Sequence, residues 1–357
     1  MNFEDTDFRM EVLDIENPFD VKMVYDFLKG LGFEYNTGDI NYTLILYNLN
    51  DEIIGTGSLN RETLKYVAVA EKFRESTAFS LIVTSLANKA LEKYKRCFVF
   101  TKPQTAKLFK GLGFSELATA EPLFTVLEFG YKTIKDYQEY LKTKKVQTQT
   151  NDIAAIVVNC NPFTKGHKYL IEKASKENEV VYLFVVKENL SVFPYEIRKE
   201  LIKKGTAHLK NVLILSTGPY IVSGAIFPDY FIKNESSNLI SEKQAEIDIK
   251  IFADYIAPVL NIKKRYVGTE NYCPITAAYN DAMKKILPQA GIQVVEIPRI
   301  TSGDDKNYIS ASKIRKAIKE DKLHEYLDFL PEVTQEFLLS QEAKPIIEKI
   351  KKNESRH

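Results

Sequence analysis

The sequence predicts an α/β protein in two parts, with a parallel sheet in the second part. The chain has 357 residues, more than one hydrophobic core ordinarily takes and enough for two domains. Residues 143–152, TKKVQTQTND, are polar apart from Val146 and read as a linker. The hydrophobic pattern changes across this stretch. We therefore expect domains at 1–142 and 153–345, followed by a charged tail at 346–357.

Before the linker, the strand pattern is of the antiparallel type and is mixed with a few helices. Apolar residues recur at helical spacing from Phe79 to Leu91. A second, short helix is expected at 104–110. Strands are expected at 41–49, 53–59, 64–70, 97–100 and 123–129. This part is predicted to be an α+β domain.

After the linker, short apolar strands alternate with amphipathic helices. Strands are expected at 153–159, 180–186, 212–215, 265–268 and 293–297, and helices at 167–177, 195–207, 240–256, 275–286 and 311–319. This alternation is typical of a parallel sheet covered by helices on both faces. In such sheets, ligands bind at the carboxyl ends of strands, often on the N-terminus of the following helix.

Composition excludes several classes of function. Lys and Arg total 49 and Asp and Glu total 48, so no global charge attracts nucleic acid or a membrane. The first residues, MNFEDTDF, lack a signal-peptide core, and no apolar run reaches the length of a membrane span. Cys97, Cys160 and Cys273 are too far apart for a disulfide framework or a zinc site. We expect a cytoplasmic protein without metal ligands of its own.

The first segment with chemical character follows the first strand of the second part. Residues 160–168, CNPFTKGHK, form a turn and then open a helix with Lys165, His167 and Lys168. Cations at a helix N-terminus have the wrong sign for its dipole, unless a bound anion supplies the missing negative charge. The Thr164 hydroxyl, the His167 imidazole and free backbone N–H groups would then converge on a phosphate. The alternative is a surface turn that carries lysines by chance.

A second helix start has the same anomaly. Residues 309–316, ISASKIRK, follow the last predicted strand, and Ser310 is a plausible N-cap. The first turn again carries cations, namely Lys313, Arg315 and Lys316. A capped, solvated surface helix would explain this segment alone. Two such starts in one domain favour a polyphosphate site.

These two segments resemble the signatures of the nucleotidylyltransferase superfamily. Residues 164–167 match its (H/T)xGH motif, and residues 309–315 match ISxTxxR with Ser312 in the Thr place. The resemblance implies a Rossmann-like fold that cleaves ATP between the α- and β-phosphates, with Mg²⁺ as counter-ion. By the same resemblance, His167 and Thr164 would contact the α-phosphate. Ser310, Ser312 and Arg315 would hold the departing pyrophosphate.

Further blocks resemble the citrate lyase ligase family, and the resemblance covers essentially the whole chain. The blocks are residues 191–198, 205–209, 218–221, 267–270 and 297–299. This resemblance implies that ATP and acetate acetylate the prosthetic-group thiol of the citrate lyase acyl carrier subunit, through acetyl-adenylate, with AMP and diphosphate as products. The nucleotide-binding residues would include Asn161, Pro162, Phe163, Lys165, Gly166, Gly268, Thr269, Glu270, Ile309, Ser310, Ser312 and Arg198. Lys165, Lys168 and Arg198 are candidates for extra phosphate contacts, and for Arg198 a surface helix charge is an equal alternative.

The first part resembles the GNAT acetyltransferase fold. Residues 66–69 would form its central strand, a helix would start near Ser76, and residues 108–114 match its late LGF block. In that family a glycine-rich loop before the helix holds the pyrophosphate of coenzyme A. Here residues 71–78 read EKFRESTA, without glycine, so acetyl-CoA use is not expected. The domain would dock the prosthetic arm or the carrier, or only brace the fold.

Two other functions stay open on the motifs alone. One is an adenylyltransferase that acts on a phosphorylated small molecule, such as a pantetheine phosphate or nicotinamide mononucleotide. The other is a regulatory ATP-binding protein without catalysis. Cys160, beside the first motif, is expected to be a buried structural thiol, and His208 and His324 lie outside any motif.

Overall fold

The computed structural model describes residues 8–187, 191–221, 228, 230–232, 235–270, 274–299, 301–302 and 307–352. The chain divides into two compact units, residues 1–137 with 226–247, and residues 138–225 with 248–357. The sequence instead assigns residues 226–247 wholly to the second domain. Their place in the first unit depends on contacts distant in sequence, which local patterns do not reveal.

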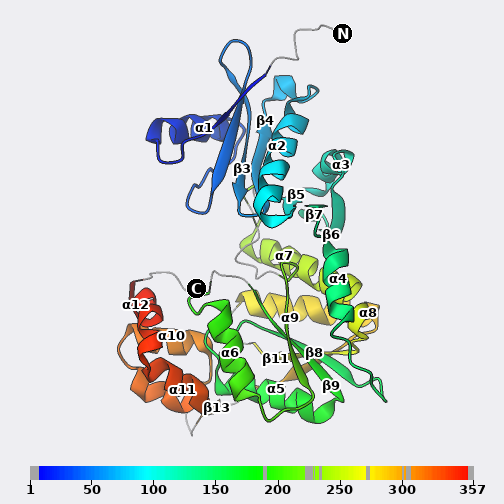
Figure 1. Ribbon diagram of the computed structural model, residues 1–357, viewed down its shortest axis with the longest axis vertical. Helices are drawn as coiled ribbons and strands as arrows, with labels where there is room; N and C mark the ends of the chain where they lie inside the picture. Colours follow the sequence, from blue (N-terminus) through cyan, green and yellow to red (C-terminus); the bar gives the residue numbers. More distant parts are fainter. Residues whose placement is uncertain are drawn as a thin grey trace. The chain divides into compact units, whose positions relative to one another are not determined.

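The first unit contains a seven-stranded sheet in the order β1-β2-β3-β4-β5-β7-β6 (Figure 1). The strands are β1 (Arg9–Val12), β2 (Tyr42–Tyr47), β3 (Ile53–Asn60), β4 (Thr63–Val69), β5 (Arg96–Thr101), β6 (Ser115–Ala120) and β7 (Phe124–Gly130). The helices are α1 (Pro18–Gly30), α2 (Ala78–Tyr94), α3 (Pro103–Gly111) and the start of α4 (Ile134–Lys142), which ends in the second unit. The expected strands and the two expected helices are confirmed, whereas β1, β6, α1 and α4 are additional. The arrangement is α+β, as predicted.

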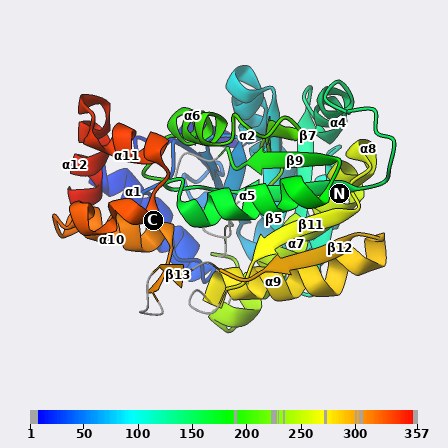
Figure 2. The ribbon, with the colours of Figure 1, turned by 90° about the horizontal axis from the view of Figure 1, so that it is seen from below.

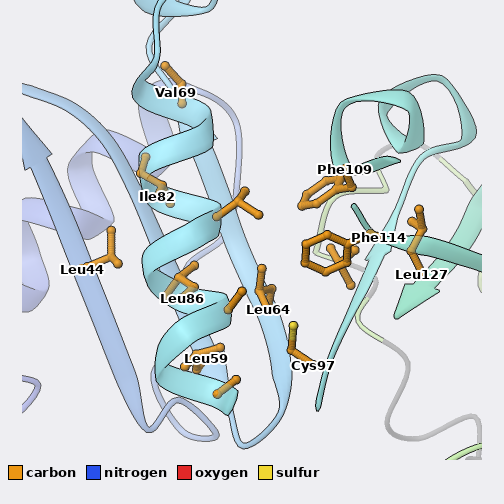
Figure 3. Packing of buried hydrophobic residues seen from close by; sticks show 14 of the residues in the cluster. Leu44, Leu59, Leu64, Val69, Ile82, Leu86, Cys97, Phe109, Phe114 and Leu127 are labelled. Atoms are coloured by element: carbon orange, nitrogen blue, oxygen red, sulfur yellow. The ribbon is translucent and has the colours of Figure 1, made fainter. Parts of the chain in front are cut away.

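Helix α2 packs its apolar stripe onto this sheet (Figure 3). Ile82 and Leu86 lie one helical turn apart and are fully buried beside Leu64 of β4. Two glycines of β3 allow the close approach. A Cβ added at Gly57 would lie 2.7 Å from Leu86 Cδ1, so even alanine would force the packed side chains of α2 to shift.

The sheet is split between β4 and β5. These strands run parallel but pair only through Thr63–Leu64 and Phe98–Val99. Beyond that point Tyr66 adopts a positive φ of 53°, and its backbone N–H donates to the Tyr230 hydroxyl at 2.7 Å. The acceptor that a neighbouring strand would ordinarily supply therefore comes from a distant side chain.

Residues 230–231 form an aromatic wedge in this unit. The Tyr230 ring lies 4.1 Å from the Tyr66 ring of β4, measured between centroids. The next residue, Phe231, meets Phe124 of β7 edge-on at 5.8 Å. Because β7 pairs with β5, the wedge connects the two halves of the split sheet.

The second unit contains a five-stranded parallel sheet in the order β10-β9-β8-β11-β12. The strands are β8 (Ile153–Val158), β9 (Val180–Val185), β10 (Val212–Ser216), β11 (Lys264–Gly268) and β12 (Gln293–Ile297). The main helices are α5 (Lys165–Glu177), α6 (Tyr195–Gly205), α9 (Pro274–Ile286) and α10 (Ala311–Lys319), joined by the last residues of α7 (Ser237–Ile251). Figure 2 shows α5, in green, along this sheet. The predicted strands and the Rossmann-like fold are confirmed; the division between the units falls within α7.

The strand order reverses at β8, and there the sheet opens. Strand β8 pairs with β9 along its whole length. With β11 it pairs only at Ala154 and Ala155, opposite Lys264 and Arg265. The two strands thus part toward their carboxyl ends. This is the topological switch point where parallel sheets bind ligands.

The C-terminal residues fold onto α10. Helices α11 (Glu332–Leu339) and α12 (Lys344–Lys352) share an apolar cluster with it. The charged tail expected from residue 346 is wrong as far as residue 352, because Ile346 and Ile350, one turn apart, are buried. Among the described residues, no helix combines the length and the apolar character needed to cross a lipid bilayer.

Candidate active site

The turn after β8 is held in an unusual backbone conformation. Cys160 has a positive φ of 53°, and the Asn161–Pro162 peptide bond is cis. Phe163 is fully buried, and Gly205 of α6 makes room for its ring, since an added Cβ would lie 2.5 Å away from it. Burial raises the pKa of the Cys160 thiol, so it stays protonated at neutral pH, as befits a structural thiol.

Thr164 and His167 form a reciprocal cap at the start of α5. Thr164 is the N-cap, and its hydroxyl oxygen accepts from the His167 backbone N–H at 3.4 Å. In return, the Thr164 backbone N–H donates to His167 Nδ1 at 3.1 Å, and the Thr164 hydroxyl oxygen lies 2.9 Å from the same nitrogen. The side chain at the third helical position is thereby fixed by the turn that precedes the helix.

This cap sets the protonation of the imidazole. A backbone N–H can only donate, so Nδ1 of His167 carries the lone pair and the neutral ring holds its proton on Nε2. Burial, assisted by the charge of Arg299, lowers the pKa of His167 to about 4. At neutral pH, His167 is therefore an uncharged donor through Nε2–H.

The second predicted helix start lies beside the first. An added Cβ at Gly166 would lie 3.6 Å from the carbonyl oxygen of Ile309, the residue that precedes the Ser310 N-cap. The Ser310 hydroxyl accepts from the Lys313 backbone N–H at 3.2 Å. The structure thus brings together two helix N-termini that are far apart in the sequence.

Arg315 links α10 to the turn after β8. Its Nη1 donates to the Asn161 carbonyl at 2.6 Å, and its Nη2 lies 3.4 Å from the Ser312 hydroxyl. Burial lowers the pKa of Arg315, but an arginine remains cationic at neutral pH. Its charge is consequently positioned between the two helix starts.

The carboxyl end of β11 contributes a third group of residues. Gly268 ends the strand, and its carbonyl accepts from the Asn280 side chain at 2.9 Å. Thr269 and Glu270 follow, and both bind Arg299, which comes after β12. Arg299 was not among the site residues predicted from the sequence. Its position just after the last parallel strand is the sequence feature that could have identified it.

Comparison with known proteins decides the family. The family model of the citrate lyase ligase C-terminal domain matches residues 153–338, more than half of the chain. The chain belongs to the citrate lyase ligase family. It is accordingly an enzyme of the ligase class.

Curated relatives in this family match most of the chain. The [Citrate [pro-3S]-lyase] ligase of Haemophilus influenzae is 37% identical, with 84% of this chain and 89% of the relative covered. That of Escherichia coli is 36% identical, with 81% and 82% covered. That of Klebsiella pneumoniae is 32% identical, with 83% and 86% covered.

In this member of the citrate lyase ligase family, Arg198 is neither a surface charge nor an exposed phosphate contact. Its side chain is fully buried. Nε donates to the Phe193 carbonyl at 2.9 Å, and Nη1 donates to the backbone and side-chain oxygens of Asn159, both at 2.8 Å. Asn161 Oδ1 accepts from the Phe193 N–H at 3.1 Å. Arg198 therefore supports the turn that carries the site.

The two lysines of the first motif differ in their surroundings. Lys165 is exposed at the start of α5. Lys168 lies 3.9 Å from Glu172 on the same helix, and Glu172 also accepts from His208 at 3.0 Å. Lys168 is thus engaged along the outside of α5, whereas Lys165 remains available to a bound anion.

The described residues do not form a metal cage. Among them, no three His, Cys, Asp or Glu side chains lie close enough together to ligate one ion. Glu270 is the carboxylate at the end of β11, and it is paired with Arg299. The described residues therefore do not fit a protein-held Mg²⁺, and an ion bound among them would be ligated mainly by phosphates and water.

Proposed function

We propose that the chain acetylates the prosthetic-group thiol on the acyl carrier subunit of citrate lyase, using ATP and acetate. Membership of the citrate lyase ligase family supports the substrate protein. One observation supports the adenylylation chemistry above others. The Thr164 N–H holds His167 Nδ1 as an acceptor, which leaves Nε2–H as a fixed neutral donor at the switch point.

The first step is nucleotidyl transfer. A carboxylate oxygen of acetate attacks the α-phosphorus of ATP, the bond from that phosphorus to the bridging oxygen breaks, and pyrophosphate leaves. Acetate is ionised near neutral pH, so no general base is required, and positioning and charge neutralisation dominate the catalysis. We assign His167 Nε2–H and the α5 N-terminus to the α-phosphate, and Ser310, Ser312 and Arg315 to the departing pyrophosphate.

The second step is thiol acylation. The carrier thiol, as thiolate, attacks the acyl carbon of acetyl-adenylate, the C–O bond to the phosphate breaks, and AMP leaves. The thiol proton passes to solvent. Cys160 plays no part in this transfer, because it is buried and its raised pKa keeps it protonated.

We propose that Mg²⁺ accompanies the triphosphate. The ion would neutralise charge on the phosphate oxygens when bound, and the residues of this chain would grip the phosphates rather than the metal. Transfer of AMP to a phosphorylated small molecule is not favoured, because the relatives that cover most of the chain are citrate lyase ligases.

Purified citrate lyase with its prosthetic thiol free tests this proposal directly. Incubation with the enzyme, ATP and labelled acetate should place the acetyl label on the acyl carrier subunit, with one AMP formed for each acetyl group. Prior alkylation of the carrier thiol should abolish labelling. Equal labelling of an unrelated phosphopantetheine-bearing carrier would contradict the assigned partner.

A further inference from the structure

Arg299 is held at the carboxyl end of β11 by two neighbouring residues. Its Nε donates to the Thr269 carbonyl at 2.8 Å, and its Nη2 forms an ion pair with the Glu270 carboxylate. Its backbone N–H lies 3.2 Å from the Thr269 hydroxyl. The guanidinium is thereby fixed beside the switch point, on the side of the site opposite to β9.

Part of this guanidinium lacks a protein partner. Within the described ranges of the chain, the Nη1 group of Arg299 donates to no protein acceptor, and 25% of the side chain remains exposed. Glu270, by contrast, is only 5% exposed. A charged side chain that is oriented by two residues but keeps N–H groups free is poised to bind an anion.

The charge of Arg299 acts on His167 across the switch point. The arginine charge is the second cause, after burial, of the low pKa of that imidazole. Two groups with complementary properties thus border the carboxyl ends of β8 and β11: a neutral Nε2–H at the start of α5 and a cation after β12. Arg315, bound to Asn161 and Ser312, belongs to the α10 side of the same site.

We propose that Arg299 donates to the α-phosphate of the nucleotide, together with His167, while Arg315 serves the pyrophosphate end. Glu270 is a positioning residue: it engages Nη2 and leaves Nη1 to the phosphate. The proposal rests on the function proposed above and adds a residue to it. Its charge would offset the negative charge that accumulates at the reacting phosphorus.

Equilibrium binding of AMP and pyrophosphate separates the two arginines without any turnover. AMP carries the α-phosphate alone, and pyrophosphate carries the departing group alone. By calorimetry, Arg299→Met should weaken AMP binding about 10- to 100-fold and change pyrophosphate binding by less than about threefold. Arg315→Met should show the reverse. Arg299→Lys keeps the positive charge but loses the planar set of guanidinium N–H donors, so it should retain part of the AMP affinity.

Two further variants complete the test. Glu270→Gln should weaken AMP binding less than Arg299→Met does, because it loosens the guanidinium without removing it. Arg74→Met, an exposed arginine of the first unit, is the matched control and should bind both ligands normally. Titration by NMR should show a higher His167 pKa in Arg299→Met than in the wild type, since the neighbouring charge is gone.

The outcomes distinguish this proposal from the function on which it rests. If the wild type binds AMP, ATP and pyrophosphate and Arg299→Met binds AMP equally well, the role of Arg299 is overturned and the proposed function stands. An Arg299→Met variant that loses pyrophosphate rather than AMP also overturns it. A wild type that binds none of these nucleotides refutes both.

Discussion

The backbone N–H of Thr164 donates to Nδ1 of His167 at 3.1 Å, so the turn after β8 selects the tautomer of the imidazole at the start of α5. The same turn is tied to α6 through Arg198 and to α10 through Arg315. The cap at Thr164 and the two arginines from α6 and α10 therefore all help to orient the Nε2–H group of His167. Its direction follows from the fold and does not require a bound ligand.

The first prediction concerns the protonation of His167. Nitrogen-15 NMR should show a neutral ring protonated on Nε2 at pH 7, titrating with a pKa of about 4. Because the unfolded pKa is about 6.5, the unfolded chain takes up the proton first as the pH falls. The stability due to neutral His167 is thus complete above about pH 6.5 and is lost toward pH 4. A ring that titrates near 6.5 would contradict the geometry.

The second prediction concerns turnover. His167→Ala should lower kcat about a hundredfold or more while the circular dichroism spectrum is unchanged, because one preorganised donor to the reacting phosphate is lost. His208→Gln is the matched control. That histidine is 52% exposed and bonded to Glu172, so its variant should keep the wild-type rate. Comparable rates in both variants would remove His167 from the mechanism.

The third prediction separates support from catalysis at Arg198. Arg198→Met should lower the free energy of unfolding by about 3 kcal/mol, since buried acceptors of Phe193 and Asn159 lose their donor. Lys203→Met, with a side chain 70% exposed on the same helix, should leave stability unchanged. Urea titration followed by circular dichroism measures both. An Arg198→Met protein with full stability and a raised KM for ATP would show a ligand contact instead.

The fourth prediction concerns coenzyme A. The wild type should show no heat of binding with acetyl-CoA, because residues 71–78 lack glycine and the Ser76 hydroxyl already accepts the Ala78 N–H before α2. In addition, Tyr230 of the aromatic wedge packs on Tyr66 where the sheet splits, and its hydroxyl already accepts the Tyr66 N–H. Stoichiometric binding of acetyl-CoA to the wild type would refute this.

The wedge itself should contribute to stability. Tyr230→Phe keeps the ring but removes the acceptor of the Tyr66 N–H, so we expect a loss of about 1 kcal/mol in thermal or urea unfolding. Tyr131→Phe, at a tyrosine that is 76% exposed, is the matched control. Equal stability of the two variants would show that the N–H finds another partner.

Much of this architecture was predictable from the sequence. The five parallel strands follow from apolar runs, and both helix starts follow from their caps and their misplaced cations. The N-terminal β1 and α1 were missed, because Arg9–Val12 is a short, exposed edge strand without an apolar pattern. Helix α12 was missed because its buried isoleucines are outnumbered by lysines and glutamates.

The site was predicted where its residues lie next to each other in sequence, and missed where they do not. Thr164 with His167, and Ser310 with Arg315, are local motifs that the structure brings together. The burial of Arg198 depends on carbonyls of Phe193 and Asn159, and the orientation of Arg299 depends on the end of β11. The affiliation of residues 226–247 with the first unit is likewise a tertiary property.

Exchange of labelled pyrophosphate into ATP tests the central claim most directly, because it reports reversible adenylylation without the carrier. Exchange should appear only when a carboxylate is supplied, with acetate the best of a series of small acids, and Lys203→Met should match the wild type while His167→Ala loses nearly all of it. Exchange that is equally fast without any carboxylate, or the formation of ADP and orthophosphate in place of AMP and pyrophosphate, would contradict the account.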